Sequence, residues 1–523
     1  MKTTIMSLLG TRSGRRSLTR IGRIKRILIC LFLSVLSVSS AFPSKNFPAD
    51  TITDYYEVET IQMPKGLTAE TDGLAIMPDG RIVAGFHRGE IMMYNPKTKT
   101  WKLFAEGIHD PLGIMAISNN EILVMQRPEL TRIKDTNGDG VADEYLTVTD
   151  DFGLSGNYHE FAFGPVKDKQ GNLFIALNCA SNGAGIFPEV RGKLDTLGRP
   201  GRMYSAVPYR GWIMKLTPDG KLHPYASGFR SPNSIGFDAN GNLFASDNQG
   251  DWLGTSKLYH VQEGKHYGHP ASLLWKEGFP HLTPSKLPVK MLDSLRTVES
   301  VAFPHSRIAD SPTQPVLDNT GGKFGPFVGK MLVGEMNHPY LVRLMLETVD
   351  GHIQGACAPF LVGSGLRKGN NRLAFAADGS LWIGQTDHGW AGDRGIQHVR
   401  WKGKVPLELA DMKLTPTGFA LTFTQPLDAA TAKQVANFQF KRYYYEYHEA
   451  YGSKQFDLQP VAVSNAELSA DGKTVTLKLA ELKAGYIYEL ELGKLRSTTQ
   501  QNLLNHLVCY TLNRLQRNTQ ANP

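Results

Sequence analysis

From residue 70 onward the chain repeats one pattern, in which an apolar run, a polar turn and a second apolar run follow one another. Each run is four to six residues long, which suits a buried β-strand rather than a helix. The second runs are RIVAGF (81–86), EILVM (121–125), NLFIAL (172–177), NLFAS (242–246), KMLVG (330–334) and SLWIG (380–384). Most of the turns before them end in glycine, as Asp79-Gly80 and Asn240-Gly241 do, and such turns predict β-hairpins.

The six turns lie about 40 to 90 residues apart. A period near 40 is typical of one four-stranded propeller blade, and longer intervals indicate insertions. The sequence therefore predicts an all-β protein, with a six-bladed β-propeller over 54–404 and insertions near 180–210, 265–297 and 304–326. An array of β-sandwiches is the alternative.

The last hundred residues lack the blade pattern. Short alternating runs at 418–423 and 474–479 predict a small Ig-like β-sandwich over 407–515. The run YYYEY at 443–447 is expected to pack against the neighbouring domain, and carbohydrate stacking is the other interpretation.

The first 41 residues read as a signal peptide. Eight basic and no acidic residues precede or flank an apolar run, ILICLFLSVLSV (27–38), and Ser39-Ser40-Ala41 is a small-residue cleavage pattern. Twelve residues are too few to span a bilayer as a helix, which needs about 20. We expect an exported protein, periplasmic or extracellular, without a transmembrane span after cleavage; an uncleaved N-terminal anchor is the alternative.

Composition narrows the possible partners. The chain has 57 basic and 49 acidic residues, and without the eight basic residues of the leader both numbers are 49. A neutral mature chain argues against nucleic-acid binding. Beyond the leader, Cys179, Cys357 and Cys509 allow at most one disulfide and form no metal-binding spacing.

Propeller topology places the segments before each first strand and after each second strand around one mouth. Four histidines and four arginines fall in these segments, and they suit an anionic, oxygen-rich ligand. They are His87, His159, His338, His388, Arg88, Arg127, Arg230 and Arg372. Simple solvation of a polar rim would give the same composition.

One loop has the spacing of a calcium site. Oxygen ligands alternate from Asp135 to Asp143 and a glycine stands at the sixth position, as in the first half of an EF-hand loop. The ligands would be Asp135, Asn137, Asp139, Val141 and Asp143. Position twelve is Leu146 instead of glutamate, so an unliganded turn is the alternative to a structural Ca²⁺.

Three segments resemble a known family. ASGFRSPNSIGFD (226–238), GNLFASD (241–247) and GKHYGHP (264–270) are similar to the central blade of the soluble quinoprotein glucose/sorbosone dehydrogenases. The likeness extends over about 70–400, and it is strongest to the membrane-bound dehydrogenase domain relatives of environmental bacteria.

The resemblance implies pyrroloquinoline quinone (PQQ) and Ca²⁺ at the mouth of the propeller, and oxidation of a sugar or related alcohol. His159 would be the catalytic base, and Gly250 and Asp251 would hold the catalytic Ca²⁺. The expected quinone contacts are Arg230, Asn233, Gln249, Trp252, His338 and His388. Because the chain has no CxxCH haem site, electrons would pass to an external acceptor such as a cytochrome or cupredoxin.

Two other functions fit the same residues. A metal-assisted lactonase or carbohydrate lyase would use a carboxylate and amide set made of Glu335, Asn337, Asp387 and Asp251. A non-catalytic propeller would bind a glycan or a protein at the same rim.

Overall fold

The computed structural model describes residues 50–516 except 188–189, 196–201, 280–283 and 389–391. The predicted signal peptide over 1–41 lies outside the described residues. The regular secondary structure of the described chain is almost entirely antiparallel β-strand, as the repeated hairpin pattern predicts.

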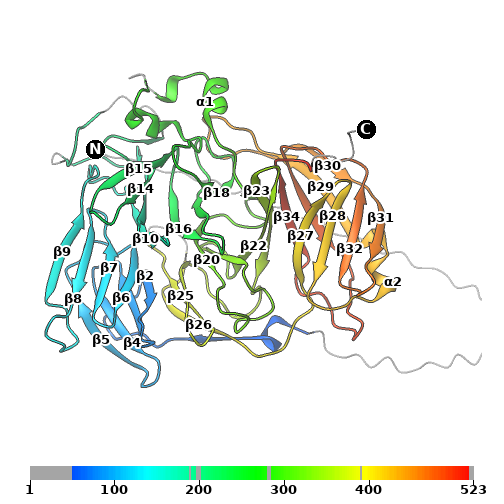
Figure 1. Ribbon diagram of the computed structural model, residues 1–523, viewed down its shortest axis with the longest axis horizontal. Helices are drawn as coiled ribbons and strands as arrows, with labels where there is room; N and C mark the ends of the chain where they lie inside the picture. Colours follow the sequence, from blue (N-terminus) through cyan, green and yellow to red (C-terminus); the bar gives the residue numbers. More distant parts are fainter. Residues whose placement is uncertain (1–49, 188–189, 196–201, 280–283, 389–391, 517–523) are drawn as a thin grey trace, which may run out of the picture. The chain divides into compact units, whose positions relative to one another are not determined.

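Six four-stranded antiparallel units make up residues 56–401 (Figure 1). In five of them the strands follow chain order, and the sixth takes its outer strand from the N-terminal end. The strands of the first three are β2 (Thr71–Ile76), β3 (Ile82–Phe86), β4 (Ile91–Asn95) and β5 (Thr100–Ala105); β6 (Gly113–Ser118), β7 (Glu121–Met125), β8 (Leu130–Lys134) and β9 (Glu144–Thr149); and β10 (Ala162–Lys167), β11 (Leu173–Leu177), β14 (Trp212–Leu216) and β15 (Leu222–Ser227).

The other three units continue around the ring. Their strands are β16 (Pro232–Phe237), β17 (Leu243–Asp247), β18 (Ser256–Val261) and β19 (Val301–Phe303); β20 (Pro312–Leu317), β21 (Met331–Glu335), β22 (Leu341–Val349) and β23 (His352–Phe360); and β24 (Asn370–Phe375), β25 (Leu381–Gln385), β26 (Gly395–Trp401) and β1 (Tyr56–Thr60). The short helix η1 (Ile52–Asp54) precedes β1.

The six predicted second strands are confirmed as β3, β7, β11, β17, β21 and β25. In five of them every residue is buried, and in β7 only Glu121 is partly exposed. A strand covered on both faces by neighbouring sheets has no polar face, which explains why these runs are continuously apolar rather than alternating.

The first strands of the six units contact one another in a closed ring, from β2 through β6, β10, β16, β20 and β24 back to β2. The ring closes because β1 pairs with β26, so that Tyr56 lies opposite Trp401 and Thr60 opposite Gln397. The arrangement is propeller-like, and it brings all the segments before the first strands to one opening.

Two of the three predicted insertions carry irregular structure, and one prediction was wrong. Residues 180–210 contain the short pair β12 (Ala180–Ser181) and β13 (Met203–Tyr204), and 265–297 contain η2 (Pro270–Trp275), η3 (Pro284–Lys286) and α1 (Val289–Leu295). The interval 304–326, however, includes β20. Its Pro312 and Pro315 masked the strand in the sequence, and the register shift between them is where a strand tolerates proline.

The tail forms two facing sheets. One contains β27 (Leu409–Thr415), β28 (Gly418–Phe423), β31 (Val463–Leu468) and β32 (Thr474–Leu479), and the other contains β29 (Phe438–Tyr444), β30 (Phe456–Val461), β33 (Tyr486–Leu492) and β34 (Leu507–Leu512). Two short helices, α2 (Ala429–Ala432) and η4 (Val435–Asn437), lie between β28 and β29. A shared apolar core that includes Phe419, Leu477 and Tyr510 lies between the two sheets.

The second tail sheet continues the fifth propeller unit. Strand β34 pairs with β23, and Cys509 lies opposite Cys357, which gives one eight-stranded sheet (Figure 1). The alternating pattern of the tail did not indicate that a tail strand pairs with a strand of the fifth unit. An Ig-like topology for the tail stays a prediction.

The aromatic run 443–447 packs, as expected, against the rest of the chain. Tyr443 is fully buried and its hydroxyl donates to Glu489 over 2.8 Å, while the Tyr447 hydroxyl donates to the carbonyl of Gly268 over 2.5 Å. The Tyr447 ring also contacts Trp252, with 5.3 Å between the ring centroids.

Two further findings concern the chain beyond the leader. Cys179, Cys357 and Cys509 are buried free thiols. Among the residues that the structure describes, no helix is long and apolar enough to cross a membrane.

The buried carboxylate of Glu489 ties the tail to the ring. Arg307, which precedes β20, donates to it from Nε over 2.8 Å, and Lys441 lies 3.1 Å from it. We expect Glu489→Ala to lower the free energy of unfolding by about 2 kcal/mol, because it leaves the buried Tyr443 hydroxyl without an acceptor and removes the partner of Arg307. Glu491→Ala removes an exposed partner of the same Arg307 and is expected to cost under about 1 kcal/mol. Denaturant unfolding of both variants tests this, and equal costs would contradict the role of Glu489.

Candidate active site

A cavity of about 730 Å³ opens where the first strands meet. This volume lies in the range of pockets that bind small molecules and cofactors, roughly 300–1,000 Å³. Its wall combines aromatic rings with arginine, histidine and carboxamide side chains. They include Phe161, Phe163, Phe187, Tyr158, Tyr451, Arg127, Arg202, Arg230, His159, His305, His388, Asn178, Asn233 and Asn248.

His159 is held in one tautomer at the cavity wall. Its Nδ1 lies 3.0 Å from the carbonyl oxygen of Cys179, and since a carbonyl only accepts, Nδ1 carries the proton. The lone pair is therefore on Nε2. Burial, followed by the positive charge of Arg230, lowers the pKa of His159 to about 4. At neutral pH the ring is an uncharged base of fixed orientation.

Arg230 is fixed from three sides. Its Nε donates to Asp251 over 2.8 Å and its backbone N–H donates to Asp247 over 2.8 Å. The guanidinium lies directly over Gly250, where an added Cβ would stand 1.8 Å from Nε. Only glycine at position 250 allows this approach. The side chain is thus pre-organised at the cavity wall, with a planar charged group suited to a carboxylate.

The expected Ca²⁺ ligands Gly250 and Asp251 do not fit a cation. Asp251 already accepts from Arg230, from His269 Nε2 at 3.3 Å and from the Met203 backbone N–H at 3.0 Å. Burial alone would raise the pKa of Asp251, but His269 and Arg230 hold it well below its ordinary value. The carbonyl of Gly250 accepts from two backbone N–H groups. Three donors share the Asp251 carboxylate and two share the Gly250 carbonyl, which leaves these oxygens little capacity for a calcium ion.

The remaining expected quinone contacts separate into two groups. Asn233, Gln249 and His388 line the cavity. Trp252 and His338 do not: Trp252 is buried against Tyr447, and His338 stacks on Tyr340 with 5.2 Å between the ring centroids. Both residues stand at rim positions in the sequence, but their side chains pack against Tyr447 and Tyr340 instead of lining the cavity.

Two carboxamides in the cavity wall have an unused acceptor. Among the described residues, neither Asn178 Oδ1 nor Asn248 Oδ1 has a hydrogen-bond partner, and both atoms are buried. An unpaired buried carbonyl costs free energy, which a ligand hydroxyl would recover by donating to it.

A loop of the tail completes the cavity wall. The Gly452 backbone N–H donates to Gly250 over 2.9 Å, and Trp252 donates to His448 over 3.1 Å. The neighbouring Tyr451 places its ring under two arginines, 4.5 Å from Arg202 and 5.4 Å from Arg230. This residue was missed at the sequence level because nothing in the tail pattern connects it to the propeller.

The loop predicted to bind a structural Ca²⁺ lies between β8 and β9. Its side chains cap their own backbone: Asp135 accepts from the N–H groups of Gly138 and Gly140 at 2.7 and 2.8 Å, and Asp143 accepts from Thr136. Asn137 and Asp139 accept in the same way from Asp139 and Val141. Its carboxylates are not among the described side chains that converge into a potential metal site, and calcium binding here stays a prediction.

The four residues of the alternative hydrolytic site do not converge. Glu335 is buried and accepts from the backbone N–H groups of Asp310, Ser311 and His338. Asp387 pairs with Arg394 at 2.6 Å, and Asp251 is occupied as described. Asn337 lines the cavity.

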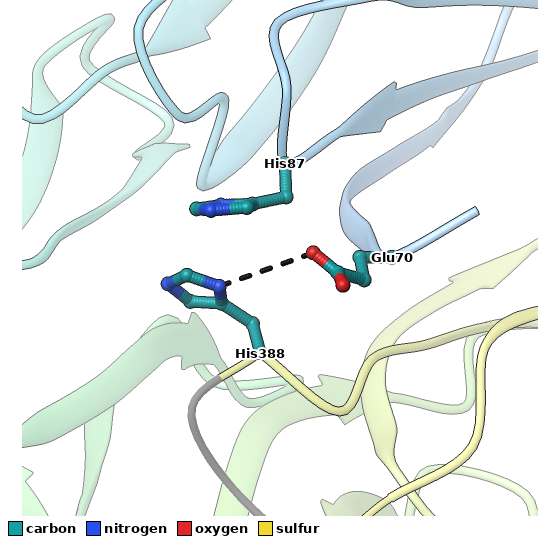
Figure 2. A group of neighbouring side chains, drawn as sticks. All are labelled: Glu70, His87 and His388. Carbon is teal, nitrogen blue, oxygen red and sulfur yellow. Dashed lines mark ion pairs between the residues drawn. The ribbon is translucent and has the colours of Figure 1, made fainter. Parts of the chain in front are cut away.

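A cluster of histidine and carboxylate side chains was not predicted as a set. His87 Nδ1 lies 3.0 Å from Asp110 and 3.7 Å from Asp72, and its ring faces that of His388 with 3.5 Å between centroids. His388 in turn lies 4.0 Å from Glu70 (Figure 2). Asp72 lies at the start of the first strand β2, and Asp110 lies just before the first strand β6. These positions beside the mouth were the only indication in the sequence that the two aspartates belong to the site.

Electrostatics in this cluster differ from those around His159. Burial, followed by repulsion from Asp110, raises the pKa of Asp72 to about 8. The hydrogen bond that His87 Nδ1 donates to Asp110 raises the pKa of His87. One side of the cavity is therefore rich in carboxylates, and the other in arginine and neutral histidine.

Comparisons with known proteins add a domain match and several solved structures. A family model described as a domain of unknown function (DUF7133) matches residues 97–286. No curated protein matches the chain.

Among solved structures, the PQQ-bound aldose sugar dehydrogenase of Streptomyces coelicolor is 18% identical, with a TM-score of 0.41 over 66% of this chain and 98% of that one. The holo PQQ domain of pyranose dehydrogenase from Coprinopsis cinerea is 13% identical, with a TM-score of 0.44 over 66% and 95%. A Trichoderma reesei carbohydrate-active enzyme of family AA12 is 12% identical, with a TM-score of 0.45 over 68% and 98%. The chain resembles these proteins, but at this identity and score no residue role transfers to it.

The protonation of His159 can be followed directly. We expect its imidazole NMR signals to titrate near pH 4, because burial and Arg230 disfavour the charged ring. Arg230→Leu removes a positive charge and should move the midpoint upward. A midpoint near the ordinary value of about 6.5 in the unmodified protein would contradict the buried, neutral base.

Gly250→Ala tests the approach of Arg230. The new methyl group would collide with the guanidinium, and we expect a loss of roughly 1–3 kcal/mol in the free energy of unfolding. Gly185→Ala is the matched control, since a Cβ there meets nothing within 4 Å. Equal unfolding curves for both variants would show that Arg230 does not lie over Gly250.

Proposed function

We propose that the chain is an exported oxidoreductase, a six-bladed β-propeller with an Ig-like sandwich as its tail, that binds a PQQ-type quinone and oxidises a sugar or related alcohol. The observation that carries the proposal is the pairing, in one aromatic cavity, of a fixed guanidinium with a neutral histidine of fixed tautomer. Export rests on the leader sequence. The proposed boundaries are 54–404 for the propeller and 407–515 for the sandwich.

The cavity suits a planar anionic cofactor. Arg230 would hold a carboxylate of the quinone, with Arg127 and Arg202 in the same wall and Asn233 and Gln249 beside them. Aromatic rings such as Tyr451 provide flat surfaces for the ring system. A bound quinone would supply the acceptor for a hydride from the substrate carbon. The proposal includes no calcium at Gly250 and Asp251, because their oxygens are occupied.

His159 would act on the substrate hydroxyl. Its Nε2 carries the lone pair and would accept the hydroxyl proton, while a hydride leaves the carbon that bears the hydroxyl and passes to the quinone. The alcohol thereby loses two electrons and two hydrogens. The Cys179 carbonyl keeps the ring oriented and accepts no proton. Because the pKa of His159 lies near 4, the base stays competent well below neutral pH.

The unused acceptors favour a polyhydroxylated substrate. Asn178 and Asn248 line the cavity, and each has a buried carboxamide oxygen without a donor among the described residues, to which a sugar hydroxyl would donate once the side chain turns toward it. Reoxidation would require an external acceptor such as a cytochrome or cupredoxin, since the sequence has no CxxCH haem site.

Titration of the purified protein with PQQ, followed by quinone absorbance and by the melting temperature, tests the proposal. We expect micromolar or tighter binding that is lost in Arg230→Ala. His159→Gln should bind quinone normally but lower the rate of dye reduction with sugars roughly 100-fold or more. Arg400→Ala, whose guanidinium pairs with Glu57 and Glu59 on the sixth unit, is the control and should bind as the parent does.

No binding at high micromolar quinone would refute the oxidoreductase. Binding that persists in Arg230→Ala would refute the assigned site. Sugar binding without turnover in the quinone-loaded protein would instead support a non-catalytic glycan-binding propeller.

A further inference from the structure

Two histidines and three carboxylates converge on the side of the cavity where the first, second and sixth units meet. Figure 2 shows both histidines and one of the carboxylates, Glu70. One ligand atom from each of Glu70, His87 and His388 lies within 4.8 Å of the others, and the same holds for Asp72, His87 and Asp110. His87 belongs to both groups. We propose that this cluster binds a divalent transition-metal ion, with His87, His388 and Glu70 as its ligands.

One oxygen of a buried carboxylate beside the cluster lacks a hydrogen-bond donor in the described part of the chain, while the other accepts from Asn371 over 3.2 Å. Asp72 is 1% exposed, and its Oδ2 has no hydrogen-bond partner among the described residues. That oxygen faces the cluster, 3.7 Å from His87 Nδ1. Asp110 bonds the same nitrogen, so two buried carboxylates face one imidazole. A cation beside His87 would give Asp72 Oδ2 an electrostatic partner that the described residues do not provide.

His87 is oriented as metal-binding histidines are. Asp110 accepts from Nδ1 at 3.0 Å, and Arg127 fixes the other Asp110 oxygen at 2.6 Å. In such a carboxylate–histidine arrangement the metal would bind the other ring nitrogen, Nε2. Asp110 is therefore a positioning residue rather than a ligand.

The charged surroundings do not exclude a cation. Glu70 pairs with Arg394 at 3.0 Å through one oxygen, while its other oxygen is the one that faces His388. Arg372 acts electrostatically on Asp72 from within the channel. Around the two histidines there are four carboxyl groups and three guanidinium groups. The carboxyl groups are those of Glu70, Asp72, Asp110 and Asp387, and the guanidinium groups those of Arg127, Arg372 and Arg394. The His87, His388 and Glu70 side chains are 30%, 22% and 13% exposed, so an ion can reach them.

The donor set indicates the kind of metal. Two imidazoles with a carboxylate suit Zn²⁺, Fe²⁺ or Mn²⁺, whereas Ca²⁺ prefers oxygen ligands alone. The site is distinct from Arg230 and His159: Phe161 lies between, 5.6 Å from the His159 ring and 6.0 Å from the His388 ring. The inference does not rest on the proposed quinone chemistry.

The test is a calorimetric titration of the chelator-treated full protein with Zn²⁺, repeated with Co²⁺ while its visible absorption is recorded. We expect one bound ion per chain and a Co²⁺ spectrum of mixed nitrogen and oxygen ligation. His87→Ala and His388→Ala should abolish binding, and Asp110→Asn should weaken it roughly 10- to 100-fold. His223→Ala changes an exposed histidine on β15 and should leave binding unchanged.

Failure to bind either ion would overturn the proposal, as would binding unaffected by both cluster histidines or lost in His223→Ala. Should His87→Ala fail to fold, Glu70→Gln alters a ligand at the rim and is expected to weaken binding at least tenfold. Quinone titration of the same samples separates the two proposals: metal binding without quinone binding refutes only the oxidoreductase.

Discussion

The pairing of β1 with β26 closes the ring of six units, and the cavity exists because of it. Chain segments at opposite ends of the ring meet in one sheet, and the register from Tyr56 to Thr60 closes the circle of six units. Once the circle is closed, each second strand is covered on both faces, and the segments that precede the first strands must converge. The cavity is a geometric consequence of this closure, and its chemistry depends on which polar residues stand at those positions.

Within the cavity, Asp251 is the junction of three distant parts of the chain. It follows β17, and it accepts from Met203 and His269 in the two insertions and pairs with Arg230 before β16. The tail reaches the same point through Gly452 and Tyr451. A carboxylate that holds so many donors orients Arg230 and is not free to bind a calcium ion. In the proposed quinone site, Arg230 and not a calcium ion at this loop would hold the cofactor.

The two walls of the cavity have opposite electrostatic character. Near His159, arginine charge and burial keep a histidine neutral, whereas Asp72 and Asp110 surround His87 with negative charge. Phe161 separates the two regions, with the Arg127 guanidinium 4.2 Å from its ring centroid. A neutral base and a cation-binding cluster can thus coexist in one pocket, because the aromatic ring and Arg127 stand between them.

The six hairpins follow from local sequence, since runs such as NLFIAL and SLWIG after a glycine turn have a local physical cause in turn conformation and strand burial. It also located His159, Arg230 and Asn233 at the mouth, because strand order alone carries residues to that edge. Long-range packing accounts for the rest: Asp251 is held by three donors, Trp252 and His338 lie outside the cavity wall, Tyr451 reaches the cavity, and β34 extends the fifth sheet. These outcomes depend on contacts between segments tens to hundreds of residues apart, and no local pattern of polar and apolar residues encodes which distant donor will reach a given lone pair.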